Sequence, residues 1–228
     1  MYPKEHPYHW PVIGYMEDLS AATHDDVKEF FTKYYAPGNA SLVIAGDINP
    51  AEVRKKVEHW FSDVKAGPQP DPIMVPPVEL TSVVTETLTD NVELPRLYMS
   101  WHSPAQFKPG DAELDVLAGV LTGGKNSRLY KRLVYDLQLV QSIGAFQASA
   151  IHGSRFQITA TARPSAEAPA DVLAKIKAII DEEIEKLKQS PPDAREVQRV
   201  LNGVESSFLN GMQQSGFKAD QMNAYYFA

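Results

Sequence analysis

The sequence predicts an α+β fold in which an antiparallel-rich sheet is covered by helices on one face. Residues 96–102 alternate between apolar and polar side chains, as a strand with two different faces does. Residues 143–163 form a hairpin pattern, and two long segments with helical spacing of apolar residues follow it. Strands followed by paired helices are typical of a sheet with helices packed against one face.

Composition sets the limits on the class of protein. At 228 residues the chain has room for one large domain, or one and a half smaller ones. Its formal net charge of −7 disfavours nucleic acid as a partner, because phosphate binding depends on clustered Lys and Arg. The lack of cysteine excludes disulfides, thiolate metal sites and a Cys nucleophile. It leaves the compartment open, since it is compatible with export and with a reducing cell interior.

The two ends of the sequence are abrupt. Residues 1–7 are typical of the middle of a loop, and residues 218–228 of a helix that is cut short. No apolar run approaches the length of a membrane span, and no basic segment followed by an apolar one resembles a signal peptide. We therefore expect an excised fragment with an added Met1.

The first 66 residues predict a helix, a strand and a second helix. Thr23 and Asp26 resemble a capping box that begins the first helix, and Pro37-Gly38-Asn39 ends it. The apolar run 41–45 predicts a buried strand. Asn49 and Pro50 then supply an N-cap and a first helical position for the second helix. The apolar residues of the two helices are Val27, Phe30, Phe31 and Tyr34, and Val53, Val57, Trp60 and Phe61.

Beyond residue 66 the pattern changes. Residues 67–77 are dense in proline and predict an extended linker, and the Thr- and Val-rich residues 78–89 predict a strand. The hairpin turns near residues 152–154. The predicted helices are marked by Leu114, Leu117, Ala118 and Leu121, by Leu129, Leu133 and Leu137, by Leu173, Ile176, Ile180, Ile184 and Leu187, and by Val197, Leu201, Val204 and Phe208.

Residues 119–126 match the phosphate-loop spacing G-x-x-x-x-G-K except at the last place. That place needs a Ser or Thr hydroxyl for Mg²⁺, and here it is Asn126. Gly119 also lies within an amphipathic helix instead of a loop after a strand. The pattern therefore favours a helix end and a tight turn between two helices over a nucleotide site.

No other pattern provides a complete active site. Residues 5–9, Glu-His-Pro-Tyr-His, superficially resemble the metallopeptidase signature H-x-x-E-H, which requires a helix. Pro7 and Pro11 make a helix implausible, and Glu5 lies outside the His pair, so these groups are expected to pack in a loop. The acidic run 181–185 alternates with lysines and predicts a solvated helix face. The remaining histidines are scattered singly at His24, His59, His102 and His152.

Several segments together resemble the pitrilysin/insulinase family of zinc metallopeptidases, including its processing-peptidase branch. Residues 6–48 resemble the stretch that follows the zinc-binding helices and closes the first structural repeat. Residues 123–149, which are GGKNSRLYKRLVYDLQLVQSIGAFQAS, resemble the glycine turn, helix and strand of the next repeat. Residues 156–165 and the two long helices fit the same repeat.

The resemblance implies a processing-peptidase-like metallohydrolase repeat. Family members pair two homologous halves of two repeats each and enclose a chamber for unfolded peptides. One half holds zinc through H-x-x-E-H and a later Glu, and the Glu within that motif serves as general base. These residues would lie upstream of Met1. Residues 1–66 would then be the C-terminal part of the zinc-type repeat, 67–77 the linker, and 78–228 a second, non-zinc repeat truncated at its C-terminus.

The resemblance also implies a function. The parent would be a zinc endopeptidase that hydrolyses peptides, while this chain would bind no catalytic zinc, be inactive alone and support the chamber. Its expected partners are peptide substrates and a second homologous half or subunit. The turn formed by Gly123, Gly124, Lys125 and Asn126 is the expected substrate-facing element, because glycines let a peptide backbone approach closely. A turn that merely joins two helices is the alternative.

The sequence departs from the family at two places. Non-catalytic halves usually carry an Arg and, seven residues later, a Tyr that assist at the substrate. Val134 and Gln141 stand at those places here, and neither can donate as that pair does. This departure implies that the chain comes from the zinc-bearing half. The alternatives are a non-catalytic scaffold or binding subunit of the same fold, and an unrelated α+β domain that binds a small ligand.

Overall fold

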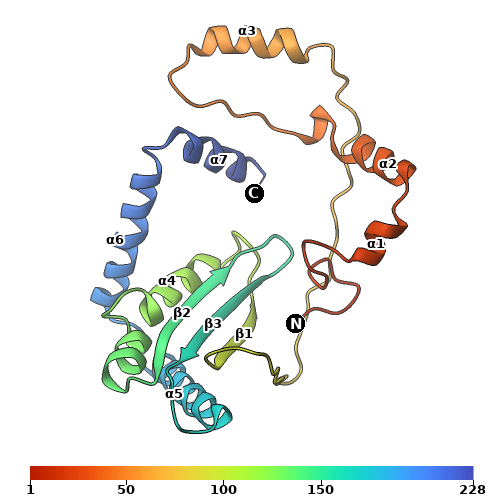
Figure 1. Ribbon diagram of the computed structural model, residues 1–228. Helices are drawn as coiled ribbons and strands as arrows, with labels where there is room; N and C mark the ends of the chain where they lie inside the picture. Colours follow the sequence, from red (N-terminus) through yellow and green to blue (C-terminus); the bar gives the residue numbers. More distant parts are fainter. Residues whose placement is uncertain (228) are drawn as a thin grey trace. The chain divides into compact units, whose positions relative to one another are not determined.

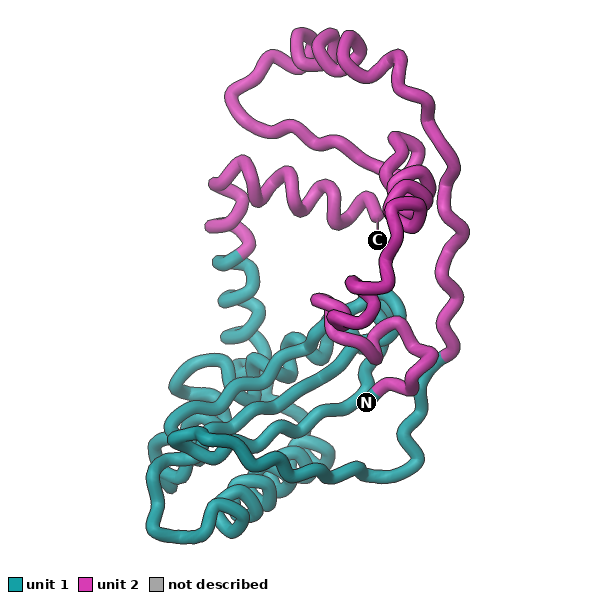
Figure 2. The backbone as a smooth tube through the Cα atoms, turned by 45° about the vertical axis from the view of Figure 1, so that its right-hand side comes forward, with its two compact units in different colours: residues 1, 77–207 teal, residues 2–76, 208–228 magenta. Residues whose placement is uncertain are grey.

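The computed structural model describes residues 1–227, which form two compact units. Unit 1 comprises Met1 and Pro77–Ser207, and unit 2 comprises Tyr2–Pro76 and the residues from Phe208 onward (Figure 2). None of the helices in residues 1–227 combines the length and the apolar composition needed to span a lipid bilayer.

Unit 1 is built on a three-stranded antiparallel sheet in the order β1-β3-β2 (Figure 1). The strands are β1 (Arg96–Ser103), β2 (Val140–Ala148) and β3 (Ser154–Ala162). Ile158 of β3 lies opposite Met99 on one side and Ala145 on the other. Gln157 lies opposite Ser100 and Phe146 in the same way. Because side chains alternate along a strand, these two rows point to opposite faces of the sheet.

The hydrophobic core lies on the face that carries Ile158. Helices α4 (Asp111–Thr122) and α5 (Pro169–Gln189) and the π-helix η2 (Tyr130–Asp136) contribute to it. The fully buried side chains at its centre are Leu121, Leu129, Leu133, Val140, Ile158, Ile176 and Ile180. The predicted α+β fold with helices on one face of an antiparallel sheet is therefore confirmed.

Two predicted strands are wrong. Residues 41–45 and 78–89 are neither strand nor helix, and most of their apolar side chains are exposed, with Leu42 at 59%, Val83 at 89% and Leu88 at 84%. An apolar or β-branched run becomes a strand only where a neighbouring segment offers backbone hydrogen bonds. Within residues 1–227 only β1, β2 and β3 pair with one another.

The predicted helices are confirmed, with two differences in detail. The helix marked by Leu129, Leu133 and Leu137 has π geometry over Tyr130–Asp136, and after it the Leu137 N–H donates to the Arg132 carbonyl five residues earlier. The helix α6 (Ala194–Gly211) buries Val200, whereas the predicted anchors Leu201, Val204 and Phe208 are exposed. Residues 67–77, as predicted, contain no helix or strand.

Unit 2 contains helices without a core of their own. They are α1 (Met16–Ala21), α2 (His24–Tyr34), the short 3₁₀ helix η1 (Pro37–Asn39), α3 (Pro50–Phe61) and α7 (Ser215–Tyr226). Thr23 and Asp26 form the predicted capping box, and the Asn49 side chain accepts from the Ala51 N–H. None of these helices has a buried residue. Local side-chain capping therefore supports α2 and α3 in the absence of tertiary burial.

Helices α4 and α6 approach each other closely at Gly119. A β-carbon at this position would lie 2.5 Å from Cγ1 of Val200 and 2.9 Å from its Cγ2. Val200 is a β-branched residue with little rotamer freedom in a helix, so it cannot turn aside easily. The glycine is therefore required by helix packing.

We expect Gly119→Ala to lower the free energy of unfolding by about 1–3 kcal/mol, because the new methyl group overpacks the contact with Val200. Gly203→Ala in α6 is the matched control, because its β-carbon would meet nothing within 4 Å. That change should raise stability by about 0.5–1 kcal/mol through helix propensity. Urea unfolding of both variants checks the opposite signs. A stabilising Gly119→Ala, or no recovery when Val200→Ala is added to it, would contradict the packing argument.

Candidate functional site

The turn at residues 123–126 follows the C-terminus of α4 directly. The Gly123 N–H donates to the Gly119 carbonyl at 2.8 Å, and a β-carbon on Gly123 would lie 2.5 Å from that same oxygen. Gly124 has a left-handed φ of +84°, and a β-carbon added to it would meet nothing within 4 Å. All four residues of the turn are exposed. The first glycine is therefore required by close packing and the second by backbone conformation, in open space.

The turn is held by hydrogen bonds on its inner side. The buried Ser127 hydroxyl donates to the Gly124 carbonyl at 2.6 Å. The Arg199 guanidinium of α6 donates to the Gly123 carbonyl and, at 3.5 Å, to the Gly119 carbonyl. A cation at a helix C-terminus is favourable because it faces the carbonyl end of the helix dipole. These contacts fix the turn on unit 1 while Lys125 and Asn126 remain open to solvent.

The same geometry argues against a phosphate loop. Gly119 lies inside α4 and contacts Val200, whereas a phosphate loop requires this glycine in a loop after a strand. The predicted helix end and tight turn are confirmed.

An ion cluster holds the helical segment after the turn. Arg128 donates to both carboxylate oxygens of Glu196 at 2.6 and 2.7 Å, and Arg132 donates to Glu182 at 2.5 Å. The buried Glu183 lies 3.6 Å from each of the two guanidinium groups. These ion pairs join the helical segment to α5 and α6. Partly buried charges are tolerated in a folded protein when they are paired and hydrogen-bonded in this way.

The pKa values reflect these contacts. The hydrogen bond from Arg128 is the main reason that the pKa of Glu196 is lowered. Hydrogen bonds from Arg132 and Lys186 lower the pKa of Glu182 to about 2. Both carboxylates therefore stay ionised over the physiological range, and neither is poised for proton transfer near neutral pH.

The prediction that residues 181–185 form a solvated face is wrong for Glu183. This residue is 8% exposed and lies against Arg128 and Arg132. Its position follows Ile176 and Ile180 at helical spacing, so the sequence did place it on the apolar stripe of α5. The acidic neighbours of Glu183 suggested a solvent-exposed face, so its helical spacing from Ile176 and Ile180 was not recognised in the sequence.

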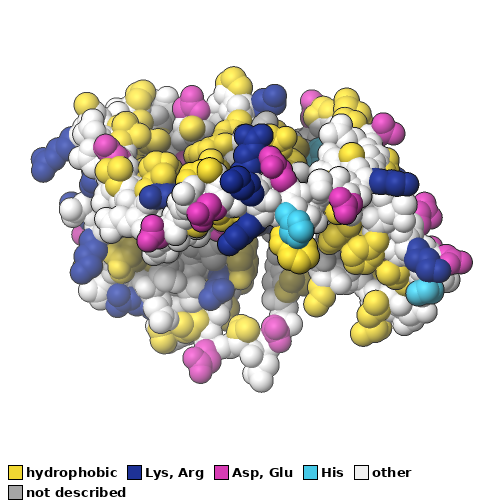
Figure 3. Space-filling model, turned by 90° about the horizontal axis from the view of Figure 1, so that it is seen from above, with side chains coloured by type: hydrophobic (Ala, Val, Ile, Leu, Met, Phe, Trp, Pro, Cys, Tyr) yellow, Lys and Arg dark blue, Asp and Glu magenta, His cyan; other side chains and the backbone are white. Residues whose placement is uncertain are grey.

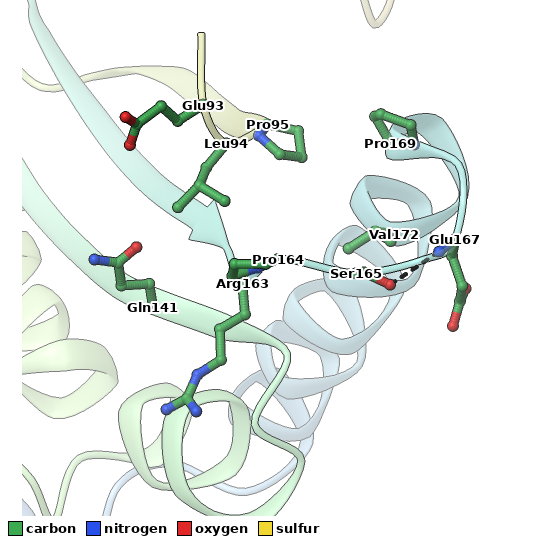
Figure 4. A pocket seen from close by; sticks show the side chains of 10 residues that line it. All are labelled: Glu93, Leu94, Pro95, Gln141, Arg163, Pro164, Ser165, Glu167, Pro169 and Val172. Atoms are coloured by element: carbon green, nitrogen blue, oxygen red, sulfur yellow. Dashed lines mark hydrogen bonds between the residues drawn. The ribbon is translucent and has the colours of Figure 1, made fainter.

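Gln141 lies at an irregularity in the sheet. Val140 pairs with Ala162 and Ser142 with Thr161, so Gln141 is an extra residue on β2, as in a β-bulge. Its side chain lines an open groove of about 520 Å³, together with Glu93, Leu94 and Arg163 (Figure 4). Bulges often occur next to functional sites, where they redirect a side chain. No local sequence pattern indicates this bulge.

Arg163 supports the bulge from the end of β3. Its Nε donates to the Val140 carbonyl at 3.1 Å and its Nη2 to the Val134 carbonyl at 3.4 Å. Figure 4 shows this side chain directed away from Gln141 and Glu93. Val134 itself is 8% exposed and belongs to the core, so its side chain cannot face a substrate.

Asp111 is the other buried carboxylate of unit 1. It accepts hydrogen bonds from the Phe107 N–H, the Gln147 amide and the Ser149 hydroxyl at 2.9, 2.9 and 2.7 Å. Burial by itself raises its pKa, but these three donors outweigh burial and the net pKa is lowered. Asp111 is the first residue of α4, and its hydrogen bonds to Gln147 and Ser149 anchor that helix to β2 and to the turn that follows β2. Sequence reasoning missed it because its partners are 36 and 38 residues away.

The histidines do not assemble a metal site. His6 stacks on Tyr2 with ring centroids 4.5 Å apart, and its Nδ1 accepts from the Tyr8 N–H at 3.0 Å. His9 Nδ1 lies 2.8 Å from the Tyr2 carbonyl. Both residues therefore pack in a loop, as the sequence predicts. Over residues 1–227, no three His, Cys, Asp or Glu side chains are grouped so that they could hold a metal ion.

Fold and site together define an α+β domain with an antiparallel sheet covered by helices on one face, and its described residues contain no metal-binding group. Residues 21–204 match the family described as the peptidase M16 inactive domain. The chain belongs to this family, which is homologous to the zinc proteases of the pitrilysin family, and the resemblance found in the sequence is confirmed.

Individual relatives agree with this assignment. The zinc protease PqqE of Helicobacter pylori is 28% identical over 213 residues, which cover 92% of this chain and 47% of that protein. The crystal structure of a protease from Helicobacter pylori has a TM-score of 0.74 at 26% identity, covering 97% of this chain and 53% of that one. A peptidase M16 inactive domain from Pseudomonas fluorescens shares the fold, with a TM-score of 0.76 at 16% identity, covering 97% and 51%. The chain spans about half the length of the curated relatives it matches.

We expect Asp111→Asn to lower the free energy of unfolding by about 2–3 kcal/mol at neutral pH. The carboxylate accepts three hydrogen bonds, whereas the amide NH₂ of Asn cannot accept any and would face groups that are themselves donors. The folded-state pKa of Asp111 is lowered, so its contribution is present above the unfolded pKa of about 3.9 and is lost as pH falls through the folded pKa. The difference between the two proteins should therefore shrink in urea unfolding below about pH 4.

Asp115→Asn is the matched control one turn along α4. Loss of surrounding water and the charge of Asp111 raise the pKa of Asp115, although much of the residue is open to solvent. Its ionised form is thus slightly unfavourable at neutral pH, and the variant should be as stable as the original or slightly more so. Equal losses in the two variants would show that Asp111 is not an anchor.

Proposed function

We propose that this chain is the non-catalytic part of a zinc endopeptidase, and that it supports the chamber in which peptides are hydrolysed. The observation that carries the proposal is that an M16 inactive domain spans about half of proteins described as zinc proteases. The zinc ligands and the general base would then belong to another segment of the parent. The alternative is a scaffold or binding subunit of the same fold without any catalytic partner.

The residues of this chain do not fit a catalytic zinc ion. Such a site needs three protein ligands that converge on an open coordination position. Over the described residues no such group exists, and His6 and His9 are engaged with Tyr2 and Tyr8 in a loop. The chain would accordingly contribute shape and peptide contacts to the parent enzyme, and its own residues carry no step through zinc.

The domain division that we propose assigns residues 1–66 to the end of a first repeat. Their helices expose large aromatic side chains, among them Phe30 at 50%, Phe31 at 51% and Trp60 at 73%. Figure 3 shows hydrophobic side chains open to solvent among the charged ones. Exposed apolar surface of this kind marks an interaction site, and the rest of the first repeat would cover it. Residues 67–77 would be the linker and 78–228 the second repeat.

Val134 and Gln141 support assignment to the zinc-bearing half. The Arg and Tyr that assist at the substrate in non-catalytic halves of the family would fall at these two places. Val134 is buried in the core and Gln141 carries an amide at the bulge, so neither acts as that pair does. A partner half would supply the pair. The same two residues would also suit a scaffold subunit that has lost the chemistry.

The turn formed by Gly123, Gly124, Lys125 and Asn126 is the element that we propose faces the substrate. It is exposed, Gly124 has open space at its α-carbon, and its inner side is fixed by Arg199 and Ser127. A fixed glycine turn lets a peptide backbone approach without side-chain obstruction.

The 228-residue chain alone should contain no stoichiometric zinc and cleave no peptide, because residues 1–227 hold no converging ligand set. Mixed with the segment of its parent that carries H-x-x-E-H, it should give a complex that cleaves an unfolded fluorogenic peptide, and a chelator should abolish the cleavage. Metal analysis and the cleavage assay check both points.

Each outcome discriminates between the alternatives. Stoichiometric zinc together with chelator-sensitive cleavage by the chain alone would overturn the division of labour. A stable complex that cleaves nothing, although the other segment binds zinc, would favour the scaffold. The absence of any complex would overturn both.

In that reconstituted enzyme, the double variant Lys125→Ala/Asn126→Ala should raise KM by about 3–10-fold with little change in kcat, since it removes contacts made equally in the ground and transition states. Neither side chain is buried, so thermal unfolding should be unchanged. Lys108→Ala is the matched control. Lys108 is an exposed residue shortly before the N-terminus of α4, at the opposite end of the helix from the turn, and its replacement should leave KM unchanged. An unchanged KM in the double variant would mean that the turn only joins two helices.

A further inference from the structure

The face of the sheet opposite the core has an unusual charge pattern. None of the residues of β1, β2 and β3 is Asp or Glu, although the chain has 29 such residues and a net charge of −7. The register places Arg96, Tyr98 and Ser100 of β1 on this face, beside Arg155, Gln157 and Thr159 of β3. None of these side chains belongs to the core cluster. The β1 and β3 part of this face therefore carries two arginines and no carboxylate in an otherwise acidic protein.

Its two arginines lack carboxylate partners within residues 1–227. Arg128 and Arg132 on the core side form ion pairs, whereas no ion pair includes Arg96 or Arg155. Arg96 donates to the Thr161 hydroxyl at 3.0 Å and to the Tyr98 hydroxyl at 3.3 Å, and its guanidinium lies 6.0 Å from the Tyr98 ring centre. These contacts hold Arg96 in place without neutralising its charge.

Arg155 is the more informative of the two. It lies on the central strand, opposite His102 of β1 and Ala148 of β2. Its Nε is buried and has no hydrogen-bond acceptor among the described residues. This Nε is shielded from solvent, so a carboxylate arriving from solvent could be received only by the terminal N–H groups of this half-buried side chain, through a charge-assisted hydrogen bond.

The spacing of the two arginines selects the shape of the ligand. Arg155 lies opposite His102, which is six positions along β1 from Arg96 (102 − 96 = 6). Six residues of strand span about 20 Å, so a compact anion cannot contact both guanidinium groups. An extended chain can, and its own side chains at positions i and i+6 point to the same side because the strand period is two.

We propose that this face binds an extended acidic peptide, with carboxylates six positions apart received by Arg96 and Arg155. The inference deepens the proposed function and rests on it, because it names the chemical class of peptide that the chamber wall would receive. Charge complementarity carries the choice of occupant. Tyr98 and Phe146, which are 59% and 43% exposed on the same face, offer apolar surface to the peptide between its carboxylates.

The test is direct binding to the 228-residue chain, measured by fluorescence anisotropy with short peptides of Ser, Thr and Val that carry a neutral dye. One peptide has two Glu six positions apart, a second has the same composition with the two Glu adjacent, and a third has Gln for both. The first should bind at least about tenfold more tightly than the third, a difference of about 1.4 kcal/mol. It should also bind more tightly than the second, and its binding should weaken in high salt.

Three variants locate the binding. Arg155→Gln and Arg96→Gln should each reduce binding of the first peptide toward that of the Gln peptide, while Arg155→Lys should retain part of it, because it keeps the charge but loses the planar guanidinium. Arg54→Gln on α3 is the matched control, since it removes one Arg far from the sheet in sequence, and it should leave binding unchanged. Thermal unfolding establishes whether each variant is folded. If Arg155→Gln does not fold, the Arg96→Gln variant provides the test instead.

The proposal fails if the chain binds none of the peptides, or binds the Gln peptide as tightly as the Glu peptide. It also fails if the two Glu arrangements bind equally, or if Arg54→Gln weakens binding as much as Arg155→Gln does. Its failure is separable from that of the proposed function, because this assay requires neither zinc nor a second segment. A reconstituted enzyme that cleaves peptides while this chain shows no preference for spaced carboxylates would overturn the inference alone.

Discussion

Burial of one face of a three-stranded sheet is the interaction on which the remainder of this structure depends. Ile158 at the centre of β3, with Ile176 and Ile180 of α5 and Leu133 of η2, forms the core that brings α4, α5 and η2 together. Because only one face is buried, the other is free to carry polar and charged groups. The single core thus determines both where the helices pack and which surface remains for ligands.

Polar contacts then position the elements that the core brings together. Asp111 anchors the start of α4 to β2, and Arg199 holds its end, so both termini of the helix are satisfied by side chains from elsewhere. Arg128, Glu183 and Glu196 join the helical segment to α5 and α6. The glycine turn between α4 and that segment is consequently a fixed feature, which is the physical requirement for presenting a backbone to a peptide.

The functional interpretation follows from what the domain has and what it lacks. It has the M16 inactive-domain fold, an exposed glycine turn and a cationic sheet face. Its described residues have no converging metal ligands. We propose that a domain of this kind contributes to proteolysis through shape and peptide contacts, and that the peptide-cutting chemistry belongs to a different segment of the parent. In the domain division that we propose, exposed aromatic groups such as Phe30 and Trp60 would be covered by the rest of the first repeat.

The sequence by itself determined the family, the helices and the core hairpin, because caps, glycine stops and apolar periodicity act over a few residues. It also placed the glycine turn. Tertiary structure alone decided that residues 41–45 and 78–89 remain unpaired, that Glu183 is buried and that Gln141 occupies a bulge. Each of these depends on partners distant along the chain. A local pattern states what a segment can become, and whether it does so depends on the groups that meet it.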